Sequence, residues 1–369
     1  MKDQKVCHIS TAHSATDVRI FHKECKSLAG AGYSVTLIAQ HGSDEVLSGI
    51  KILALPRTGK RAKRMVLLLG KALKRALKED ARLYHIHDPE LLPLALFLKL
   101  FTGAKIVYDA HEDYTQKILS KDWINKGLRG PVSKLTGALE RFCAFFFNFI
   151  ITTESHTQKR FPAGKSGVIA NYPPLSVNRE EEPEKKGHPF RAIYVGGITE
   201  DRGASVMAGS LGYLNGKGIE LHLAGKVFEQ KASELFETSR IKYHGRLEWE
   251  EIAQHLRAAH VGLVLLQPVP AYLYCHAENI TKLFEYMLFG LPVIISDFPK
   301  LKEFVALHDC GITVDPTRPD LVAKALNFLY ENPDVREKMG RNGRKAVLEK
   351  FNWEKESRKL LEIYRKLLD

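Results

Sequence analysis

The sequence predicts an α/β protein with two domains, each built around a parallel sheet. Three observations support this prediction. The chain has 369 residues, which is too long for one ordinary hydrophobic core and suggests about two domains. Short β-rich runs alternate with amphipathic stretches from end to end, as expected for strands joined by crossover helices. A polar segment interrupts this alternation near the middle of the chain, and the alternation then resumes.

The first half contains seven short runs with the composition of strands. They cover residues 5–9, 34–39, 50–55, 83–87, 105–108, 149–153 and 168–170. One helix start between them is explicit, because Asp88 is a good N-cap and Pro89 suits the first helical position ahead of Glu90.

The domain boundary is expected where the alternation breaks, at Tyr172-Pro173-Pro174 and the polar stretch that follows. We therefore expect a first domain over residues 1–172, a linker over 173–189 and a second domain over 190–350. Six further strands are predicted in the second domain, over residues 192–195, 220–223, 241–243, 261–266, 293–295 and 312–314. The last helix, within residues 351–369, follows the final strand and could pack on either domain.

The composition, with 44% hydrophobic and 27% charged residues, is that of a soluble globular protein. The apolar runs at 91–101 and 142–151 are shorter than the roughly 20 residues that a membrane span needs. The N-terminus reaches a strand without a long apolar region or cleavage site, so we expect no secretory signal and a cytoplasmic protein. Five scattered cysteines without a Cys-x-x-Cys pair predict reduced packing residues.

The net charge of +12 belongs to the first half of the chain. Residues 1–172 carry 27 Lys plus Arg against 15 Asp plus Glu, whereas the remainder is balanced. Nine basic residues, Arg61 and Arg64 among them, alternate with leucines over residues 57–78. This segment suits an anionic membrane surface or a phosphorylated substrate, although a helix that buries its leucines and solvates its lysines has the same pattern. No nucleic acid is expected, because no known binding motif is present.

The most informative motif covers residues 278–297 and predicts a short helix, beginning at Asn279 or Thr281, followed by a buried strand. Lys282 falls in the first turn, where a cation opposes the helix dipole unless an anion sits against the free backbone N–H groups. This is the layout of a phosphate site. Glu285, one turn later, suits two neighbouring hydroxyls of a sugar, because a carboxylate accepts from both. The alternative is a solvated helix whose Lys and Glu have no ligand.

Other candidate residues follow predicted strands, where ligands bind in open parallel sheets. They are His13, Asp17 and Arg19; His85, His87 and Asp88; His111; Gly196, Gly197 and Arg202; and Gly225 with Lys226. The glycines let the backbone approach a ligand, and Arg202 and Lys226 could meet a diphosphate. Gly196-Gly197 lacks the G-x-G-x-x-G spacing of a dinucleotide site. His85 and His87 could bind a metal with Asp88 or His111, but no ligand spacing supports this, and we expect no metal.

Taken together, these motifs resemble those of the retaining nucleotide-sugar glycosyltransferases of family four, which have the two-domain GT-B fold. The resemblance covers nearly the whole chain. It comprises residues 6–40 with His13, Asp17, Arg19 and Glu24, then 87–92, 108–113, 194–197, 244–246, 282–294, 339–344 and 352–354. It implies two Rossmann-like domains facing across a cleft. It also implies transfer of a sugar from a nucleotide sugar to an acceptor hydroxyl with retention, in cell-surface polysaccharide or glycolipid synthesis.

The resemblance also assigns roles to residues. The first domain would bind the acceptor, the second the donor, and the last helix would cross back onto the first. The residues implied as catalytic are His111 and Glu285; those for the donor are Gly196, Gly197, Arg202, Lys226, Glu278, Lys282 and Glu285; those for the acceptor are His13, Asp17, Arg19, Arg61 and Arg64. No cofactor is implied. The expected partners are a nucleotide-sugar donor and a glycan or lipid-linked acceptor, with possible peripheral contact with the anionic inner face of a membrane.

Two positions depart from the family pattern. Gly197 stands where many members have an arginine that holds the diphosphate. The family tends to pair two glutamates with seven residues between them, and counting back from Glu285 gives Ala277, with Glu278 one position away. A nucleotide-sugar epimerase of the same architecture and a non-catalytic sugar-nucleotide or membrane-binding protein are the alternative functions. Product analysis separates all three.

Overall fold

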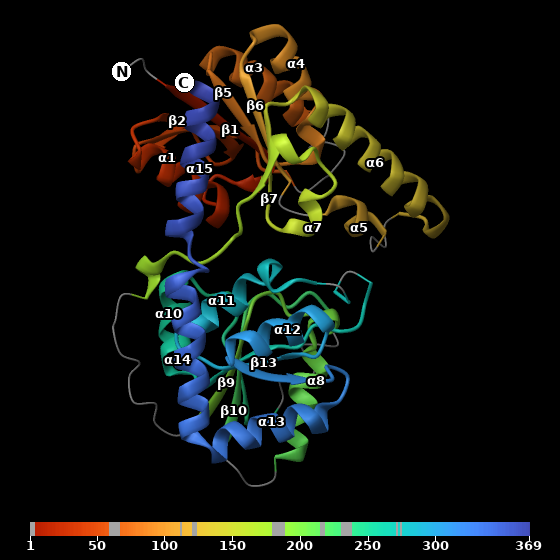
Figure 1. Cartoon of the computed structure of the whole chain (residues 1–369), viewed down its shortest axis with the longest axis vertical. Coiled ribbons are helices and arrows are strands. Elements are labelled where there is room, and N and C mark those ends of the chain that lie inside the picture. Colours follow the sequence, from red (N-terminus) through yellow and green to blue (C-terminus); the bar gives the residue numbers. More distant parts are fainter. Residues whose placement is uncertain are drawn as a thin grey trace. The chain divides into compact units, whose positions relative to one another are not determined.

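The chain folds into two compact units (Figure 1). The computed structural model describes residues 4–58, 67–110, 113–119, 124–178, 189–214, 218–229, 238–270, 272–273 and 275–369. The first unit comprises Met1–Asn171 with Trp353–Asp369, and the second comprises Tyr172–Asn352. Each unit has a sheet flanked by helices, and nearly all strand pairs are parallel. The predicted fold class is therefore confirmed.

The sheet of the first unit has eight strands in the order β3-β4-β2-β1-β5-β6-β7-β8. Their bounds are β1 (Lys5–Ser14), β2 (Ser34–Gln40), β3 (Glu45–Leu47), β4 (Ile50–Leu55), β5 (Leu83–Ile86), β6 (Lys105–Ala110), β7 (Phe149–Thr152) and β8 (Ser166–Val168). Six of the seven predicted strands are confirmed, whereas the strand predicted at 168–170 overlaps β8 only at Val168. We did not predict β3, a three-residue edge strand that pairs antiparallel with β4 across a turn in which Ser48 and Gly49 have positive φ.

Helices cover both faces of this sheet. The helical segments are η1 (Val18–Cys25), α1 (Lys26–Gly30), α3 (Leu69–Glu79), η3 (Pro89–Leu91), α4 (Leu92–Thr102), α5 (Tyr114–Leu119), α6 (Lys126–Phe146), α7 (Ser155–Gln158), η4 (Ala163–Lys165) and α15 (Trp353–Leu368). Side chains of η1, α1 and α15 form one hydrophobic core with the sheet. Those of α3, α4 and α6 form another, so the sheet is buried on both faces.

The last helix, α15, belongs to the first unit, beside α1 (Figure 1). Leu360, Tyr364 and Leu368 recur every four residues and form one buried stripe of this helix. At its start, the indole Nε1 of Trp353 donates to Ser27 Oγ at 2.9 Å. Near its end, a guanidinium nitrogen of Arg82 donates to the carbonyl of Leu368 at 2.8 Å. Apolar burial and hydrogen bonds at both ends thus hold α15 on the first unit.

The second unit has a six-stranded sheet in the order β11-β10-β9-β12-β13-β14. The strands are β9 (Phe190–Val195), β10 (Ile219–Ala224), β11 (Ile241–Tyr243), β12 (Val261–Val264), β13 (Val293–Ser296) and β14 (Gly311–Val314), and all six were predicted. The helical segments are η5 (Leu175–Val177), η6 (Glu200–Arg202), α8 (Ala204–Ser210), η7 (Leu211–Tyr213), α10 (Trp249–Ala258), η9 (Ala277–Asn279), α11 (Thr281–Leu288), α12 (Pro299–His308), α13 (Pro319–Glu331) and α14 (Pro333–Glu349).

The strand order locates the ligand-binding edge of each sheet. In the second unit β9 lies between β10 and β12, so the chain winds to one side of β9 and then to the other. In the first unit β1 lies in the same way between β2 and β5. Ligands of open α/β sheets bind beyond the carboxyl ends of the strands at such a switch point. The loops after β9 and β1 are therefore the places to examine.

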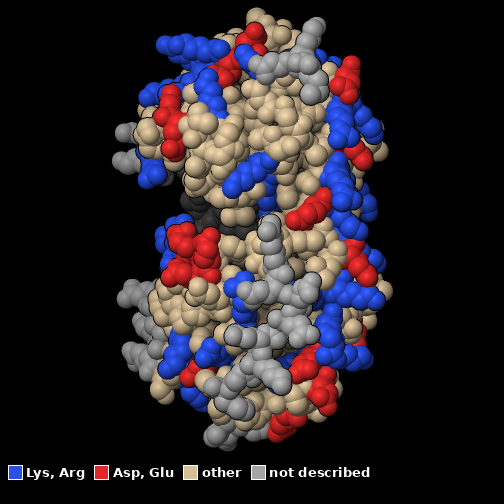
Figure 2. Space-filling model, turned by 90° about the vertical axis from the view of Figure 1, so that its left-hand side faces the viewer, with Lys and Arg blue, Asp and Glu red and all other residues tan. Residues whose placement is uncertain are grey.

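Two surface properties bear on the predicted membrane contact. Within the described part of the chain, no helix is both long enough and apolar enough to span a bilayer. On the face drawn in Figure 2, Lys and Arg lie among Asp and Glu, so no patch of a single charge sign covers that face.

Candidate functional site

Glycines bring the loops after β9 and β10 into contact in the second unit. Gly196 and Gly225 have φ values of +128° and +144°, which residues with a side chain rarely adopt. A Cβ on Gly225 would lie 1.9 Å from the carbonyl oxygen of Gly196. A Cβ on Gly196 would lie 2.9 Å from Nζ of Lys282. Gly196 thus leaves the space that this ammonium occupies.

Helix α11 is fixed against the same edge by Tyr286. The phenol ring packs on β12 at Gly262, where a Cβ would lie 2.2 Å from ring atom Cδ2. The hydroxyl accepts a hydrogen bond from the backbone N–H of Val195 at 2.8 Å. The helix begins at Thr281, as predicted, and its N-cap residue, Ile280, offers no side-chain cap. The N–H of Leu283 donates to the carbonyl of Ile280 at 2.9 Å, and the other first-turn N–H groups are suited to an anion.

Lys282 is half-buried at this edge, and its Nζ is a buried atom with no hydrogen-bond partner among the described residues. The ammonium lies 3.8 Å from the ring centroid of Tyr194. Burial first, and then the positive charge of Arg202, hold the pKa of Lys282 well below its ordinary value, against the opposing effect of Glu285. A buried cation without a hydrogen bond costs free energy, and a bound anion would remove that cost.

Arg202 supplies a second cation from η6. Its Nη1 donates to the carbonyl of Gly197 at 3.3 Å, and a Cβ on Gly197 would lie 2.9 Å from the same nitrogen. Tyr194 also donates to this carbonyl, at 2.7 Å. The next residue, Gly203, has φ +81°, and a Cβ there would lie 2.5 Å from the carbonyl oxygen of Leu265. Arg202 thus lies against Gly197, where many family-four members carry an arginine.

The other predicted donor residues lie on η9, on α11 and in the loop after β10. Glu285 is half-buried on α11, one turn beyond Lys282. Glu278 lies on η9, directly before α11, and is also half-buried. Lys226 is exposed on the loop after β10, with Nζ 5.1 Å from the ring centroid of Phe228. The structure therefore brings Gly196, Gly197, Arg202 and Lys282 into direct contact.

In the first unit, Asp88 ties the loop after β1 to the end of β5. One carboxylate oxygen accepts from the backbone N–H of Thr11 at 2.7 Å, from that of Ala12 at 3.1 Å and from Ser10 Oγ at 2.9 Å. Burial opposes ionisation, but His13 and these donors hold the pKa of Asp88 well below its usual range. Asp88 does occupy the N-cap position of η3, as predicted, but it makes no capping hydrogen bond there. The donors of the loop after β1 engage its carboxylate instead.

The predicted acceptor residues divide into two groups. His13 is 30% exposed, and its Nδ1 lies 3.2 Å from Asp88 and 3.1 Å from Ser10 Oγ, so its ring is held at the strand edge. Asp17 accepts from the backbone N–H groups of Arg19 and Ile20 at 2.9 and 3.0 Å and caps η1. A capping carboxylate is engaged within the fold, which leaves His13 as the better candidate for ligand contact.

Arg19 is only 6% exposed and does not face a ligand-binding surface. Its guanidinium donates to both carboxylate oxygens of Asp109 at 2.8 and 3.1 Å and to the carbonyl of Ile169 at 3.2 Å, and lies 3.1 Å from Glu24. The structure therefore does not support direct contact with an acceptor. Instead, Arg19 fixes Asp109 near the end of β6, just before His111. The predicted residues His111, Arg61 and Arg64 lie outside the described residues.

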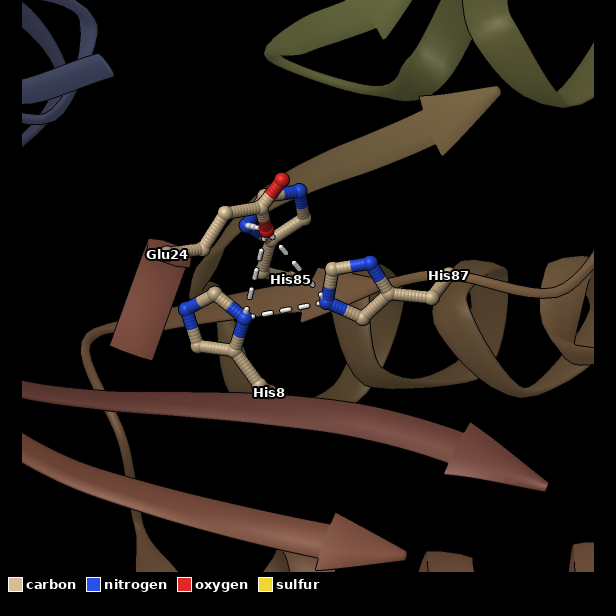
Figure 3. A group of neighbouring side chains, drawn as sticks. All are labelled: His8, Glu24, His85 and His87. Atoms are coloured by element: carbon tan, nitrogen blue, oxygen red, sulfur yellow. Dashed lines mark hydrogen bonds and ion pairs between the residues drawn. The ribbon is translucent and has the colours of Figure 1, made fainter. Parts of the chain in front are cut away.

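Three histidines and Glu24 form a buried cluster beside Arg19 (Figure 3). His8 Nδ1 lies 2.9 Å from His87 Nε2, and Tyr364 OH lies 3.1 Å from His8 Nε2 and 2.8 Å from His85 Nδ1. Burial, followed by the neighbouring imidazoles, lowers the pKa of both His8 and His85, which favours neutral rings.

One set of neutral tautomers satisfies these contacts. His85 donates to Tyr364, Tyr364 to His8, and His8 to His87, whose Nδ1 lies 3.4 Å from Asp109. The residue types suit a metal, but the nitrogens that face Glu24, namely His8 Nδ1, His85 Nδ1 and His87 Nε2, are engaged with one another or with Tyr364. Nε2 of His85 and both carboxylate oxygens of Glu24 have no hydrogen bond among the described residues, and Glu24 is held by its ion pair with Arg19. The cluster is thus a core that is only partly hydrogen-bonded. Sequence reasoning missed Tyr364, because nothing in a local pattern pairs it with a histidine 279 positions away.

Comparisons with known proteins agree with this architecture. A family model described as glycosyl transferases group 1 matches residues 178–346, and one described as Glycosyltransferase Family 4 matches residues 18–167. The D-rhamnosyltransferase WbpZ of Pseudomonas aeruginosa is 24% identical over 282 residues, covering 73% of this chain and 69% of that protein.

Two solved structures show the same fold over nearly their whole length. A sucrose-phosphate synthase from Thermosynechococcus elongatus has a TM-score of 0.74 at 19% identity and covers 99% of both chains. The Anabaena protein Alr3699/HepE, solved with UDP and glucose, has a TM-score of 0.72 at 14% identity, covering 99% of this chain and 100% of that one. The predicted GT-B fold is confirmed.

Proposed function

Because the chain belongs to the family-four type of glycosyltransferases, we propose that it moves a hexose from a nucleotide sugar to an acceptor hydroxyl with retention of configuration. The acceptor belongs to a cell-surface polysaccharide or glycolipid. The name of the similar D-rhamnosyltransferase supports a role in glycan synthesis.

The observation that carries the proposal is the ammonium of Lys282 at the switch point of the second sheet, which has no hydrogen-bond partner among the described residues. In the donor complex, Lys282, Arg202 and the first-turn N–H groups of α11 hold the diphosphate. Negative charge grows on the leaving diphosphate as the bond to the sugar breaks. Cations that are already in place stabilise this charge without reorganisation.

Other residues act on the sugar. Glu285, half-buried on α11, accepts hydrogen bonds from neighbouring sugar hydroxyls. His111 follows β6 by one residue, and its contact with the sugar remains a prediction. The Arg19–Asp109 ion pair supports this role, because it fixes the backbone two residues before His111.

The first unit supplies the acceptor site. A groove of about 900 Å³ lies beside α3 and is lined by Lys71, Lys74, Arg75 and Lys78. Arg75 pairs with Asp44 at 2.7 Å, whereas the three lysines are exposed. Three exposed ammonium groups along one groove favour an acceptor with a phosphate or carboxylate group. His13 lies at the carboxyl edge of the same sheet.

Product analysis tests this function. A panel of nucleoside diphosphates is screened by thermal shift to identify the base, and the corresponding nucleotide sugars are then incubated with candidate acceptors. Transfer to an acceptor with an unchanged anomeric configuration, read by NMR, is the expected result. Isomerised free donor would identify an epimerase instead, and donor binding without any turnover would identify a non-catalytic binding protein.

A further inference from the structure

Helix α6 carries its large apolar side chains on its exposed face. Its buried positions are Ser133, Gly137, Glu140, Cys143 and Ala144, which are mostly small or polar. Its exposed large apolar residues are Leu128, Leu135, Leu139, Phe142, Phe145 and Phe146, whose exposed fractions run from 36% to 71%. A surface helix of a globular protein normally has the opposite arrangement.

These side chains form a continuous stripe. Leu135, Leu139, Phe142 and Phe146 recur at alternating steps of four and three residues, which places them on one face of the helix. The ring centroids of Phe142 and Phe146 are 5.3 Å apart, and those of Phe145 and Phe146 are 5.4 Å apart. The aromatic end of the stripe is therefore a contact cluster.

Helix α4 extends this surface. It contacts α6, and the strands that follow the two helices, β6 and β7, are neighbours in the sheet. The carboxyl ends of α4 and α6 thus reach the same edge of the first unit (Figure 1). Phe97, Leu100 and Phe101 are exposed at the end of α4, and the two phenyl rings stack at 4.3 Å between centroids. Exposed apolar side chains of this number on two helices in contact indicate an interaction site.

The charge of this surface indicates its partner. Residues 92–105 and 126–149 contain six basic residues, Lys99, Lys105, Lys126, Arg129, Lys134 and Arg141. They contain one acid, Glu140, which is buried and bound to Tyr108 at 2.9 Å and Arg160 at 2.6 Å. The exposed surface of both helices is therefore apolar and positive, with no exposed carboxylate in these two segments.

We propose that the apolar and basic face of α4 and α6 docks on an anionic lipid bilayer. Apolar side chains enter the boundary between head groups and acyl chains while flanking Lys and Arg meet the anionic head groups. A second copy fits less well, because symmetric pairing would place positive charges opposite each other. This surface differs from the segment 57–78 that the sequence suggested. The proposal does not depend on the donor site in the second unit.

The test is co-sedimentation of the full-length protein with vesicles of phosphatidylcholine, alone or mixed with phosphatidylglycerol, at low and high salt. The parent is expected to bind the anionic vesicles, more weakly as salt rises. The variant Leu135→Ser with Phe142→Ser should lose at least about tenfold in partition coefficient. The variant Lys134→Gln with Arg141→Gln should lose about fivefold for each charge.

Leu307→Ser is the matched control. Leu307 is 78% exposed on α12 of the second unit, so this change removes an equally exposed apolar side chain elsewhere. It should leave vesicle binding unchanged. All variants should keep the parent's Tm and its affinity for nucleoside diphosphates, because the substituted side chains lie on exposed helix surface.

Three results would overturn the proposal. Failure of anionic vesicles to retain the parent protein even at low salt would exclude membrane docking. Equal losses of vesicle binding in Leu307→Ser and in Leu135→Ser with Phe142→Ser would show that the effect does not come from the α6 face. Sedimentation velocity showing a dimer that the α6 variant dissociates, with vesicle binding unchanged, would assign the face to a second copy.

Discussion

Replacing Lys282 with Met should weaken diphosphate binding and stabilise the ligand-free protein at the same time. Methionine keeps an unbranched apolar chain near the length of lysine but removes the charge. The Nζ that it removes is buried without a hydrogen-bond partner, 3.8 Å from the ring centroid of Tyr194. The same ammonium therefore costs stability in the free protein and provides affinity in the complex.

The stability effect has a definite sign and pH range. The unfolded chain keeps the ordinary lysine pKa of 10.5, whereas the folded state holds the pKa of Lys282 well below it. Below the unfolded value, the unfolded state binds this proton more readily, so the ammonium destabilises the fold. A difference of one between the folded and unfolded pKa values corresponds to about 1.4 kcal/mol in the free energy of unfolding. Lys282→Met should raise Tm at neutral pH, and the gain should disappear as the pH approaches that of free lysine.

The binding effect follows from the loss of a charge-assisted hydrogen bond. Such a bond contributes on the order of 1.5 to 3 kcal/mol, so the dissociation constant of a nucleoside diphosphate should rise by about 12- to 160-fold. The diphosphate should also raise the pKa of Lys282, so that the parent takes up a proton on binding. Calorimetry in two buffers of different ionisation enthalpy measures this uptake, which Lys282→Met should lose.

Lys302→Met is the control, because Lys302 is exposed on α12 of the same unit. It should change neither Tm nor diphosphate affinity appreciably. Unchanged diphosphate affinity in Lys282→Met would place Lys282 outside the donor site. A fall in Tm would show that Nζ is stabilised within the fold, which contradicts the reasoning from its missing partner.

Three further predictions concern two residues of the proposed reaction and one glycine of the donor-site loops. Glu285→Ala should abolish transfer with little change in Tm, because its carboxylate binds the donor; a changed Tm with unchanged kinetics would refute this. His111→Ala should lower kcat far more than it raises KM, since a group that acts as the bond breaks appears in turnover; equal turnover would exclude that role. Gly225→Ala should cost more than about 2 kcal/mol in urea unfolding, because its Cβ would lie 1.9 Å from Gly196 O at φ +144°; parent-like stability would show that the loops can separate.

The fold could be predicted because its signals are local. Strand composition, polar turns and the alternation with helices predicted thirteen strands, and the same alternation predicted that the sheets are parallel. The start of α11 and the unusual cation in its first turn were also visible in the sequence. Lys282 stood out because it opposes the helix dipole, and the structure adds that its ammonium is buried without a hydrogen bond.

The sequence could not predict which side chains pair between segments that are far apart in the chain. Arg19 and Asp17 lie in a motif that suggests ligand contact, yet Arg19 pairs with Asp109 and Asp17 caps η1. Tyr364 completes the histidine cluster from the last helix. The spacing of apolar residues shows that a helix has an apolar face, but it does not show whether that face meets a core. For α6 the buried positions are those of Ser133, Gly137 and Glu140.

The two units treat their buried charges in opposite ways. In the first unit, Arg19 is matched by Asp109 and Glu24, and the neighbouring imidazoles satisfy one another through Tyr364. This network pairs the buried groups largely with one another, although both carboxylate oxygens of Glu24 and Nε2 of His85 have no hydrogen bond among the described residues. In the second unit, Lys282 keeps a buried ammonium with no hydrogen bond, beside Arg202 and against glycines that leave room for it. A bound anion would relieve that cost while the amine keeps its proton, so the second unit carries a direct physical argument for binding the diphosphate of the donor.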